Sequence, residues 1–430
     1  MLKFFYSITV LVIVFQISIF AQPSEPPKDS RAYERLAIKA YHAKDFPAFL
    51  ENMKQADSLN PNHPRITYNL AIAYNLNGKT SEAITSLTKL AAMKLVYPIE
   101  KDDDFASLKT TADFQNLVKT FEANAKPTNQ AQTAFNVHEK GLVAESVAYD
   151  AKTKNFYLAS VAGRKILKVG ADGKTTIFAD KSLGLWSVFG IKIDSKRQIL
   201  WAASSAHKQM PDLKAEENGM TGIFKFDLKS GKLIKKYSVS NQPKAHWLGD
   251  LSIAPNGDVY ATDSINPMIF IIRRAKDEIE PFLESANFVS PQGLDFTPNG
   301  KYMLMADYSK GIFKINLATK EVTKIIPAEN STMLGIDGLY FRQNSLIATQ
   351  NGVNPQRVIR FVLSKDLNRV ERFEILEANN PLFDEVTLGV LSGDQFYFIA
   401  NSQWNLLGDG GKFAAPEKLT DVNILKIKLK

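Results

Sequence analysis

The tripeptide Gln292-Gly293-Leu294 returns 45 residues later as Asp337-Gly338-Leu339, and related tripeptides recur along the chain from residue 145 onward. The other copies are Glu145-Ser146-Val147, Phe189-Gly190-Ile191, Gly249-Asp250-Leu251 and, more loosely, Leu388-Gly389-Val390. Their first positions lie 44, 60, 43, 45 and 51 residues apart, and each copy leads into an alternating hydrophobic run, a turn and a second β-rich run. Self-similar β units of this length predict a β-propeller with about four strands per blade. Six copies predict six blades.

Turn residues separate the strands that follow each phrase. The third copy is followed by Pro255-Asn256-Gly257-Asp258 and the fourth by Pro298-Asn299-Gly300-Lys301. Asn-Gly supplies the positive φ angles that a tight hairpin needs. We expect residues 422–429 to complete the last blade and the strand around residues 134–137 to close the ring beside it.

Composition limits the classes of function. The chain has 430 residues, a net charge of +8, 45% hydrophobic residues and no cysteine. This length predicts two domains, and the lack of cysteine excludes disulfides, thiol nucleophiles and zinc–thiolate sites. The positive charges are spread singly and form no basic tract with interleaved aromatic residues, so we do not expect nucleic-acid binding.

Residues 1–21 have the pattern of an export signal peptide. Lys3 precedes an apolar run, and the small residue Ala21 stands before Gln22-Pro23. Ile19 departs from the small-residue pattern of a cleavage site, which leaves an uncleaved N-terminal anchor as the alternative. No other segment is long and apolar enough to span a bilayer. The sequence therefore predicts a periplasmic or secreted protein with no integral membrane domain beyond this signal.

Residues 33–122 are predicted to form a small helical domain after a linker at residues 22–32 that is rich in Pro and Ser. The dipeptide Leu36-Ala37 returns as Leu70-Ala71 after 34 residues. The residues that stand where a tetratricopeptide repeat has its packing positions are Leu70, Ala71, Tyr74, Ala83 and Leu87, with Tyr33, Ala56 and Pro61 in the first copy. The pattern resembles a tetratricopeptide pair, with Ala40 and Phe49 off pattern.

Such a domain either binds a protein partner in its groove or serves only as a packing collar, since two repeats are few for a stable stack. Residues 105–118 are expected to cap the repeats. A second linker spans residues 123–134, and the propeller spans residues 135–430. The predicted fold is mainly β, a six-bladed β-propeller preceded by a small α-helical, tetratricopeptide-like domain.

The first residues of the six phrases are candidates to line one central pocket, because equivalent inner-strand positions converge on a propeller axis. Three of them carry oxygen donors: Glu145, Gln292 and Asp337. Two carboxylates and a carboxamide directed at one axis are costly unless something neutralises them. Oxygen ligands suit a hard divalent cation, and Ca²⁺ is the first candidate. The alternative is a water-filled channel in which these side chains are merely hydrated.

Chain direction places the loops between second and third strands over the starts of the inner strands. Loops at the mouth of a rigid scaffold are where binding residues concentrate. The candidate substrate-binding residues are Asn351, Asn354, Arg357, Gln403 and Trp404 from these loops, and Trp186 just before an inner strand. Arg357 would hold a carboxylate or hydroxyls, and the two tryptophans would stack on a sugar ring.

The inner-strand phrases and the blade count make residues 135–430 resemble the SMP/gluconolactonase/luciferin-regenerating family, in which SMP stands for senescence marker protein. Many of its members are six-bladed propellers with one catalytic divalent metal on the axis. The resemblance implies a metal held by Glu145, Gln292 and Asp337, where Gln292 replaces the usual Asn and is one methylene longer. The family often has Asn-Asp where this chain has Gly249-Asp250, so one amide is missing and Asp250 is retained.

Two functions are predicted as alternatives. One is an exported, metal-dependent hydrolase of lactones or related esters, in which Ca²⁺ polarises the carbonyl and Asp337, or less favourably Asp250, activates water. The other is a non-catalytic propeller that binds a small ligand or a protein, with the tetratricopeptide-like domain as its interaction module. The sequence identifies neither the substrate nor the oligomeric state.

Overall fold

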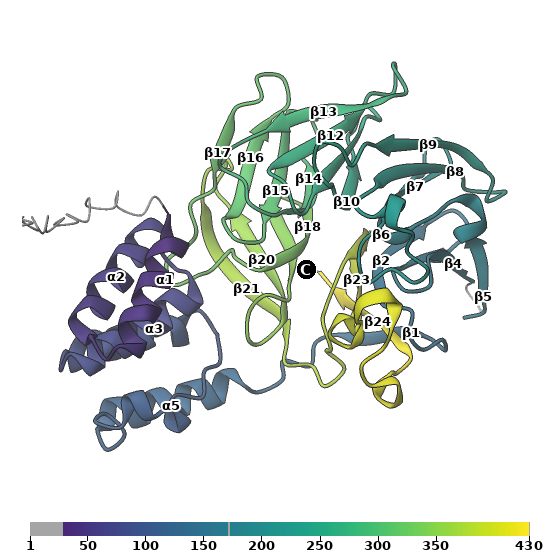
Figure 1. Cartoon of the computed structure of the whole chain (residues 1–430). Helices are drawn as coiled ribbons and strands as arrows, with labels where there is room; N and C mark the ends of the chain where they lie inside the picture. The colour runs from purple at the N-terminus through teal and green to yellow at the C-terminus, as the bar shows by residue number, and fades with distance from the viewer. Residues whose placement is uncertain (1–28, 171–172, 430) are drawn as a thin grey trace, which may run out of the picture.

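The computed structural model describes residues 29–170 and 173–429, and it shows a helical region followed by six four-stranded sheets arranged in a ring (Figure 1). The predicted six-bladed β-propeller preceded by helices is confirmed. The predicted signal at residues 1–21 lies outside the described residues. Within these two ranges, no helix is long and apolar enough to cross a bilayer.

The helices of the described chain all begin at or after Ser30 and come before the first strand, apart from short 3₁₀ turns. They are α1 (Ser30–His42), α2 (Phe46–Leu59), α3 (Pro64–Leu76), α4 (Thr80–Ala92) and α5 (Ala112–Asn124). Asp29 caps α1 and Asp45 caps α2, each by accepting a bond from a first-turn backbone N–H. Ala37 and Ala71 are fully buried, and these small side chains let the helices pack closely. Helix α5 contributes Phe114 to the same core.

Each blade is one antiparallel sheet whose strands follow one another outward from the axis. The strands are β2 (Ala144–Asp150), β3 (Asn155–Ser160), β4 (Lys165–Val169) and β5 (Thr175–Ala179) in blade one; β6 (Ser187–Asp194), β7 (Ile199–Ser205), β8 (Thr221–Asp227) and β9 (Leu233–Val239) in blade two; and β10 (Leu248–Ile253), β11 (Val259–Asp263), β12 (Met268–Ile272) and β13 (Ile279–Glu284) in blade three. They continue as β14 (Pro291–Phe296), β15 (Tyr302–Asp307), β16 (Gly311–Asn316) and β17 (Val322–Lys324) in blade four, and β18 (Ile336–Arg342), β19 (Ser345–Gln350), β20 (Arg357–Leu363) and β21 (Val370–Ala378) in blade five.

Blade six combines the two ends of the propeller sequence. It consists of β22 (Gly389–Ser392), β23 (Gln395–Ile399), β24 (Val422–Lys428) and, as its outer strand, β1 (Gln132–Val137). Strands β1 and β24 are antiparallel, with Val137 opposite Val422. The ring is therefore closed by main-chain hydrogen bonds between segments far apart in sequence, as expected for residues 134–137.

The ladder between first and second strands is interrupted at the recurring phrases. The register shifts fall between Ala144 and Ser146, Val188 and Ile191, Leu248 and Asp250, Pro291 and Leu294, and Ile336 and Leu339. A β-bulge leaves a residue outside the ladder and redirects its side chain. The first residue of each of these phrases is thus released from regular pairing at the point where it meets the axis.

The helical region packs against blade five, next to β20 and β21 (Figure 1). Arg357, at the start of β20, is only 1% exposed. Its Nε donates to Gln350 Oε1 at 2.6 Å, and its Nη1 donates to the carbonyl oxygen of Met93, after α4, at 2.8 Å. The backbone N–H of Val96 also donates to the carbonyl oxygen of Asn354 at 2.8 Å. Arg357 therefore joins the helices to the propeller.

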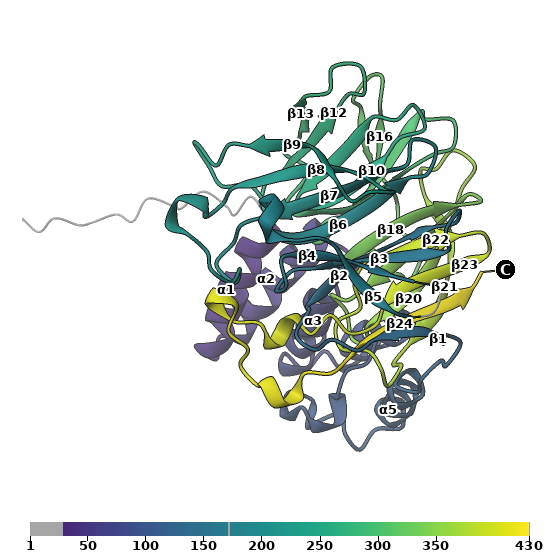
Figure 2. The ribbon, with the colours of Figure 1, turned by 90° about the vertical axis from the view of Figure 1, so that its right-hand side faces the viewer.

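Several loops project on the side of the propeller where α1 lies. Figure 2 shows there the loop between β7 and β8 and the loop between β23 and β24. These two loops touch, because Gln209 Nε2 donates to the carbonyl oxygen of Leu407 at 2.7 Å. This side of the propeller carries the candidate site.

Replacing Arg357 with Met should destabilise the protein and loosen the helical region. The change leaves Gln350 Oε1 and the Met93 carbonyl without their buried donor, which costs about 1–3 kcal/mol for each such group. The free energy of unfolding in guanidinium chloride and the rate of proteolysis between residues 93 and 131 would measure it. Arg372→Met, an exposed arginine on neighbouring β21, is the control. Equal stability of the two variants would contradict the anchoring role.

Candidate active site on the propeller axis

The first residues of all six phrases line one pocket of about 240 Å³ on the propeller axis. The structure therefore brings together the predicted metal ligands Glu145, Gln292 and Asp337, which come from β2, β14 and β18. A wider mouth of about 480 Å³ shares these three residues and adds Tyr308 and Asn351 from the loops above. The loops between second and third strands do overhang the pocket at these positions.

One side of the pocket is acidic, and a neighbouring donor holds each carboxylate by one oxygen. Trp404 Nε1 donates to Glu145 Oε2 at 2.6 Å, and Asn351 Nδ2 donates to Asp337 Oδ2 at 3.2 Å. Each bond goes to one oxygen of its carboxylate, and the described residues donate no hydrogen bond to Glu145 Oε1 or Asp337 Oδ1. Each carboxylate thus keeps one oxygen available to a ligand.

Burial and mutual repulsion make these carboxylates hold protons tightly. Burial, and then the charge of Asp337, raise the pKa of Glu145 well above its usual value. Burial, and then the charges of Asp250 and Glu385, raise the pKa of Asp337 to about 7. The hydrogen bonds from Trp404 and Asn351 act in the opposite direction but do not offset burial. A bound cation would relieve this repulsion.

Asp250 is only 2% exposed and differs from the other carboxylates in having a cation beside it. Its Oδ1 lies 3.7 Å from Lys192 Nζ and accepts the backbone N–H of Leu251 at 2.8 Å. Its Oδ2 is buried without a partner among the described residues. Burial raises the pKa of Asp250, and Lys192 opposes the shift. Asp250 is therefore held by the wall of the pocket, and Asp337 is the better placed of the two predicted catalytic carboxylates.

The other side of the pocket is aromatic. Phe189 lies 5.2 Å from Trp247 and 6.0 Å from Trp404 between ring centroids, the latter pair being stacked. His207, near the start of the loop between β7 and β8, stacks on Trp247 at 4.6 Å and is 5% exposed, so it supports the aromatic side from a buried position. Burial lowers the pKa of His207 to about 4, which keeps the ring neutral at pH 7. The sequence predicted that Phe189, the first residue of its phrase, lines the pocket. It did not single out Trp247.

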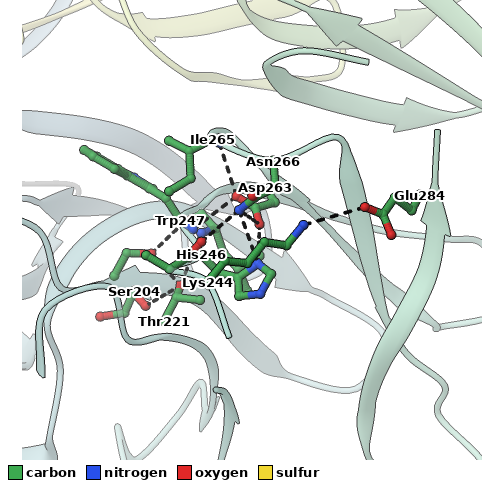
Figure 3. A network of polar contacts seen from close by, with 12 residues as sticks. Ser204, Thr221, Lys244, His246, Trp247, Asp263, Ile265, Asn266 and Glu284 are labelled. Atoms are coloured by element: carbon green, nitrogen blue, oxygen red, sulfur yellow. Dashed lines mark hydrogen bonds and ion pairs between the residues drawn. The ribbon is translucent and has the colours of Figure 1, made fainter. Parts of the chain in front are cut away.

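Asp263 at the end of β11 positions Trp247 (Figure 3). Its Oδ1 accepts the backbone N–H groups of Trp247 and Ile265 at 3.1 and 3.2 Å. Its Oδ2 lies 2.5 Å from His246 Nδ1 and accepts Asn266 Nδ2 at 2.9 Å. His246 is therefore a hydrogen-bonded support for the loop and does not line the axial pocket.

Glu385 is a further carboxylate at the mouth that the sequence did not reveal. It lines the wider mouth with Glu145 and Asp337, and its charge contributes to the raised pKa of both. Its backbone φ is +69°, a left-handed conformation that is uncommon for a residue with a side chain and concentrates at functional sites. No residue pattern around Asp384-Glu385 predicts this left-handed conformation.

Four of the predicted substrate-binding residues do not line the axial pocket. Arg357 is covered by the chain after α4, and Asn354 Nδ2 donates to the carbonyl oxygen of Val96 in the same contact. Trp186 is 3% exposed in the core of blade two, and its Nε1 donates to Glu217 Oε1 at 3.2 Å. Gln403 is 5% exposed and accepts the backbone N–H of Thr420 at 3.1 Å. Asn351 and Trp404 are the two that reach the site.

The oxygen atoms of Glu145, Gln292 and Asp337 are of the kind that bind a hard divalent cation. Gln292 Oε1 accepts a long bond of 3.3 Å from Ser264 Oγ, while its amide nitrogen is held by Ser290 Oγ at 3.1 Å. Two carboxylates and one carboxamide oxygen are the ligand types that Ca²⁺ takes. Across residues 29–170 and 173–429, no group of three or more His, Asp or Glu side chains is arranged to hold a metal. The amide of Gln292 would have to supply the third protein ligand.

No model of a known protein family matches the chain, and no curated protein matches it either. Solved structures with a similar fold do exist. The chain is similar to regucalcin, a calcium-binding protein from Agrobacterium tumefaciens, with 15% identity over 69% of this chain and 96% of that one, at a TM-score of 0.48. It is similar to a gluconolactonase from Xanthomonas campestris with 12% identity over 70% and 92%, at a TM-score of 0.44.

A third solved structure comes from a protein with another chemistry. It is the aldose sugar dehydrogenase of Streptomyces coelicolor in its PQQ-bound form, with 13% identity over 70% of this chain and 98% of that one, at a TM-score of 0.47. Gluconolactonase is also one of the names of the family that residues 135–430 resemble in sequence. At such identities these likenesses say nothing of the chemistry, which has to be inferred from this chain's own residues.

Asp337 should make the stability of the metal-free protein depend on pH. Because its pKa rises from 3.8 to about 7 on folding, the folded state binds the proton more tightly, and the free energy of unfolding falls as the pH rises between these values. The contribution of Asp337 should fall by about 4 kcal/mol. Denaturant unfolding from pH 4 to 8 in chelator would measure it.

Asp337→Asn should make this pH dependence shallower, because Glu145 and Asp250 keep raised pKa values of their own, whereas the exposed control Asp394→Asn should leave it unchanged. Added Ca²⁺ should stabilise the native protein more at pH 7 than at pH 5, because protons and the cation compete for the same carboxylates. An unchanged slope in Asp337→Asn would contradict the placement of this carboxyl.

Proposed function

We propose that the protein is an exported hydrolase of lactones or related esters, with Ca²⁺ held on the axis by Glu145, Gln292 and Asp337. The observation that supports this most is the meeting of two mutually repelling carboxylates and an amide oxygen from three different blades in one pocket. Such convergence is costly without a cation. The apolar run at residues 4–20 after Lys3 supports export to the periplasm.

Asp337 would act as the general base. A pKa of about 7 matches a group that accepts a proton from water at neutral pH, although a bound cation lowers this value. When bound, the cation would supply Lewis-acid polarisation of the acyl carbonyl. Asn351 donates to Asp337 Oδ2 and so fixes the orientation of the carboxylate in the pocket. Lys192 holds Asp250 at the wall, so Asp250 would keep the pocket polar without taking the proton.

The aromatic side would hold the substrate ring against the carboxylates. Trp404 and Phe189 offer stacked faces, and Trp404 at the same time holds Glu145. A flat or puckered ring with apolar C–H faces fits between such a wall and polar groups. The loop residues Asn351 and Trp404 remain the proposed substrate contacts, and Glu385 adds an acceptor for hydroxyl groups at the mouth.

The same pocket would also serve binding without turnover. Gly249 offers no amide where the resemblance implies one, so part of the polar lining is missing. In this second function the propeller would bind a small ligand, and the helical region would contact a protein partner. Cation binding without any lactone or ester turnover would favour it.

Asp337→Ala should abolish lactone turnover, with kcat/KM falling by at least about 10³-fold, because one side chain serves as ligand and base. Turnover of a panel of γ- and δ-lactones, followed by proton release, would measure it. Chelator should remove the native activity and Ca²⁺ should restore it. Full activity of Asp337→Ala, with Asp394→Asn as folded control, would refute the mechanism.

Ca²⁺ titration by calorimetry tests the cation site without any substrate. Native protein should bind one Ca²⁺ saturably, and Glu145→Gln should weaken this binding by roughly 100-fold, since one of two ligand charges is lost. The exposed control Glu374→Gln, on β21, should bind like the native protein. Absence of saturable binding to the native protein would overturn the proposed metal and leave the binding function.

Trp404→Phe separates the two roles of this side chain. The phenyl ring keeps a stacking face but cannot donate to Glu145 Oε2, whereas Trp404→Leu loses both. If stacking holds the substrate, KM should change little in the Phe variant and rise roughly tenfold in the Leu variant. An equal rise of KM in both variants would show that substrate binding depends on the hydrogen bond to Glu145 and not on stacking against the ring.

A further inference from the structure

A second cavity, larger than the axial pocket, lies away from the axis. A cleft of about 660 Å³ lies between the helical region and the propeller loops, and residues of both line it. From the helices come Arg31 and Arg65, near the starts of α1 and α3, and from the propeller come Lys310 and Asn351. This volume is within the range of sites that hold small molecules.

The cleft is positively charged. Its side chains include Arg31, Arg65 and Lys310 but a single carboxylate, Glu34. Glu34 is 7% exposed and accepts Arg65 Nε and Nη2 at 3.0 and 3.1 Å, so this pair is self-neutralised. Burial lowers the pKa of His63, which also lines the cleft and is therefore neutral at pH 7.

Two cations of the cleft have no ion-pair partner within the part of the chain that the structure describes. Arg31 Nη2 donates to the neutral Ser309 Oγ at 2.8 Å, which places the guanidinium at the propeller side. Among the described residues, the Lys310 ammonium has neither a hydrogen bond nor an ion pair. The N-terminus of α3, which His63 caps, opens on the same cleft and adds the positive end of its dipole, whereas the Asp29 carboxylate caps α1.

The cleft is joined to the axial site by shared residues and hydrogen bonds. Tyr308 and Asn351 line both the cleft and the mouth of the axial pocket. The Tyr308 hydroxyl donates to Asn351 Oδ1 at 3.0 Å, and Asn351 Nδ2 donates to Asp337 Oδ2 at 3.2 Å. A molecule lying along these residues would have one end at the axial carboxylates and the other beside Arg31 and Lys310.

We infer that the cleft binds an oxyanion, a carboxylate or phosphate group on an arm of the ligand whose ring occupies the axial pocket. This inference rests on the proposed function only in placing the ring of the ligand in the axial pocket. Negative charge is repelled by the axial carboxylates and attracted by Arg31 and Lys310, so the two adjoining regions fix the direction of an extended ligand. The helical region then completes the substrate site.

The test measures binding of anion probes to the full chain, independently of turnover. Glutarate and inorganic phosphate would be titrated by ligand-observed NMR and calorimetry, with glutaramide as the uncharged control. Arg31→Gln combined with Lys310→Gln should weaken glutarate roughly tenfold, because both unpaired charges are lost. Arg274→Gln combined with Lys276→Gln, an exposed pair on a propeller hairpin, is the matched control.

Glutarate or phosphate binding that is lost in the cleft variant and kept in the control variant supports the inference, and the tighter of the two identifies the preferred oxyanion. Equal loss in both variants, equal affinity for glutaramide, or no probe binding to the native protein overturns it. Asp337→Asn should retain glutarate binding. If the native protein binds the probes but turns over no lactone, the proposed function is refuted and the inference of an anion site in the cleft is retained.

Discussion

The close approach of neighbouring inner strands is the constraint on which the axial site depends. A Cβ atom at Gly293 would lie 2.5 Å from the backbone nitrogen of Leu339, and one at Gly190 would lie 2.5 Å from Asp250 Oδ1. No side chain fits at these second positions of the phrases without displacing the next blade. In these two phrases the tight packing and the bulge beside it leave the first position as the one that projects to the axis.

A ring of bonds between blades holds this arrangement in place. The contacts are Ile191 N to Ser146 Oγ, Leu248 N to Thr221 Oγ1, Thr262 Oγ1 to Gln292 O, Phe341 N to Asp295 Oδ2, Gly389 N to the Tyr340 hydroxyl and Leu388 N to Glu145 O. Every pair of adjacent blades is linked. Because Glu145 and Gln292 take part through their backbone oxygens, a shift of one blade would move a residue of the pocket.

Most of the propeller architecture could be predicted because the sequence repeats from blade to blade. The phrases gave the blade number, the inner strands and the meeting of Glu145, Gln292 and Asp337, since equivalent positions in equivalent strands share one geometry. A carboxyl or carboxamide group also recurs at the ends of second strands, as Asp263, Asp307 and Gln350, and could have indicated which residues hold the mouth loops.

Contacts between segments that do not repeat could not be predicted in the same way. Arg357 has the appearance of a mouth-loop arginine, and only the position of residues 93–96 turns it into a buried anchor. Trp186 precedes an inner strand but turns into the core of blade two. Glu385 depends on a left-handed backbone that its neighbours in sequence do not specify.

The buried anchor gives the helical region a fixed place, and this changes how its role is understood. A helical pair joined only by a flexible linker would present its surface to partners independently of the propeller. Here Arg357 and Asn354 bond to the chain after α4, and Arg31 reaches Ser309 on the propeller. The starts of α1 and α3 are therefore held beside Tyr308 and Asn351, two hydrogen bonds from Asp337. The helices add the positive charge of Arg31 to that of Lys310 on the propeller, at the edge of an acidic pocket.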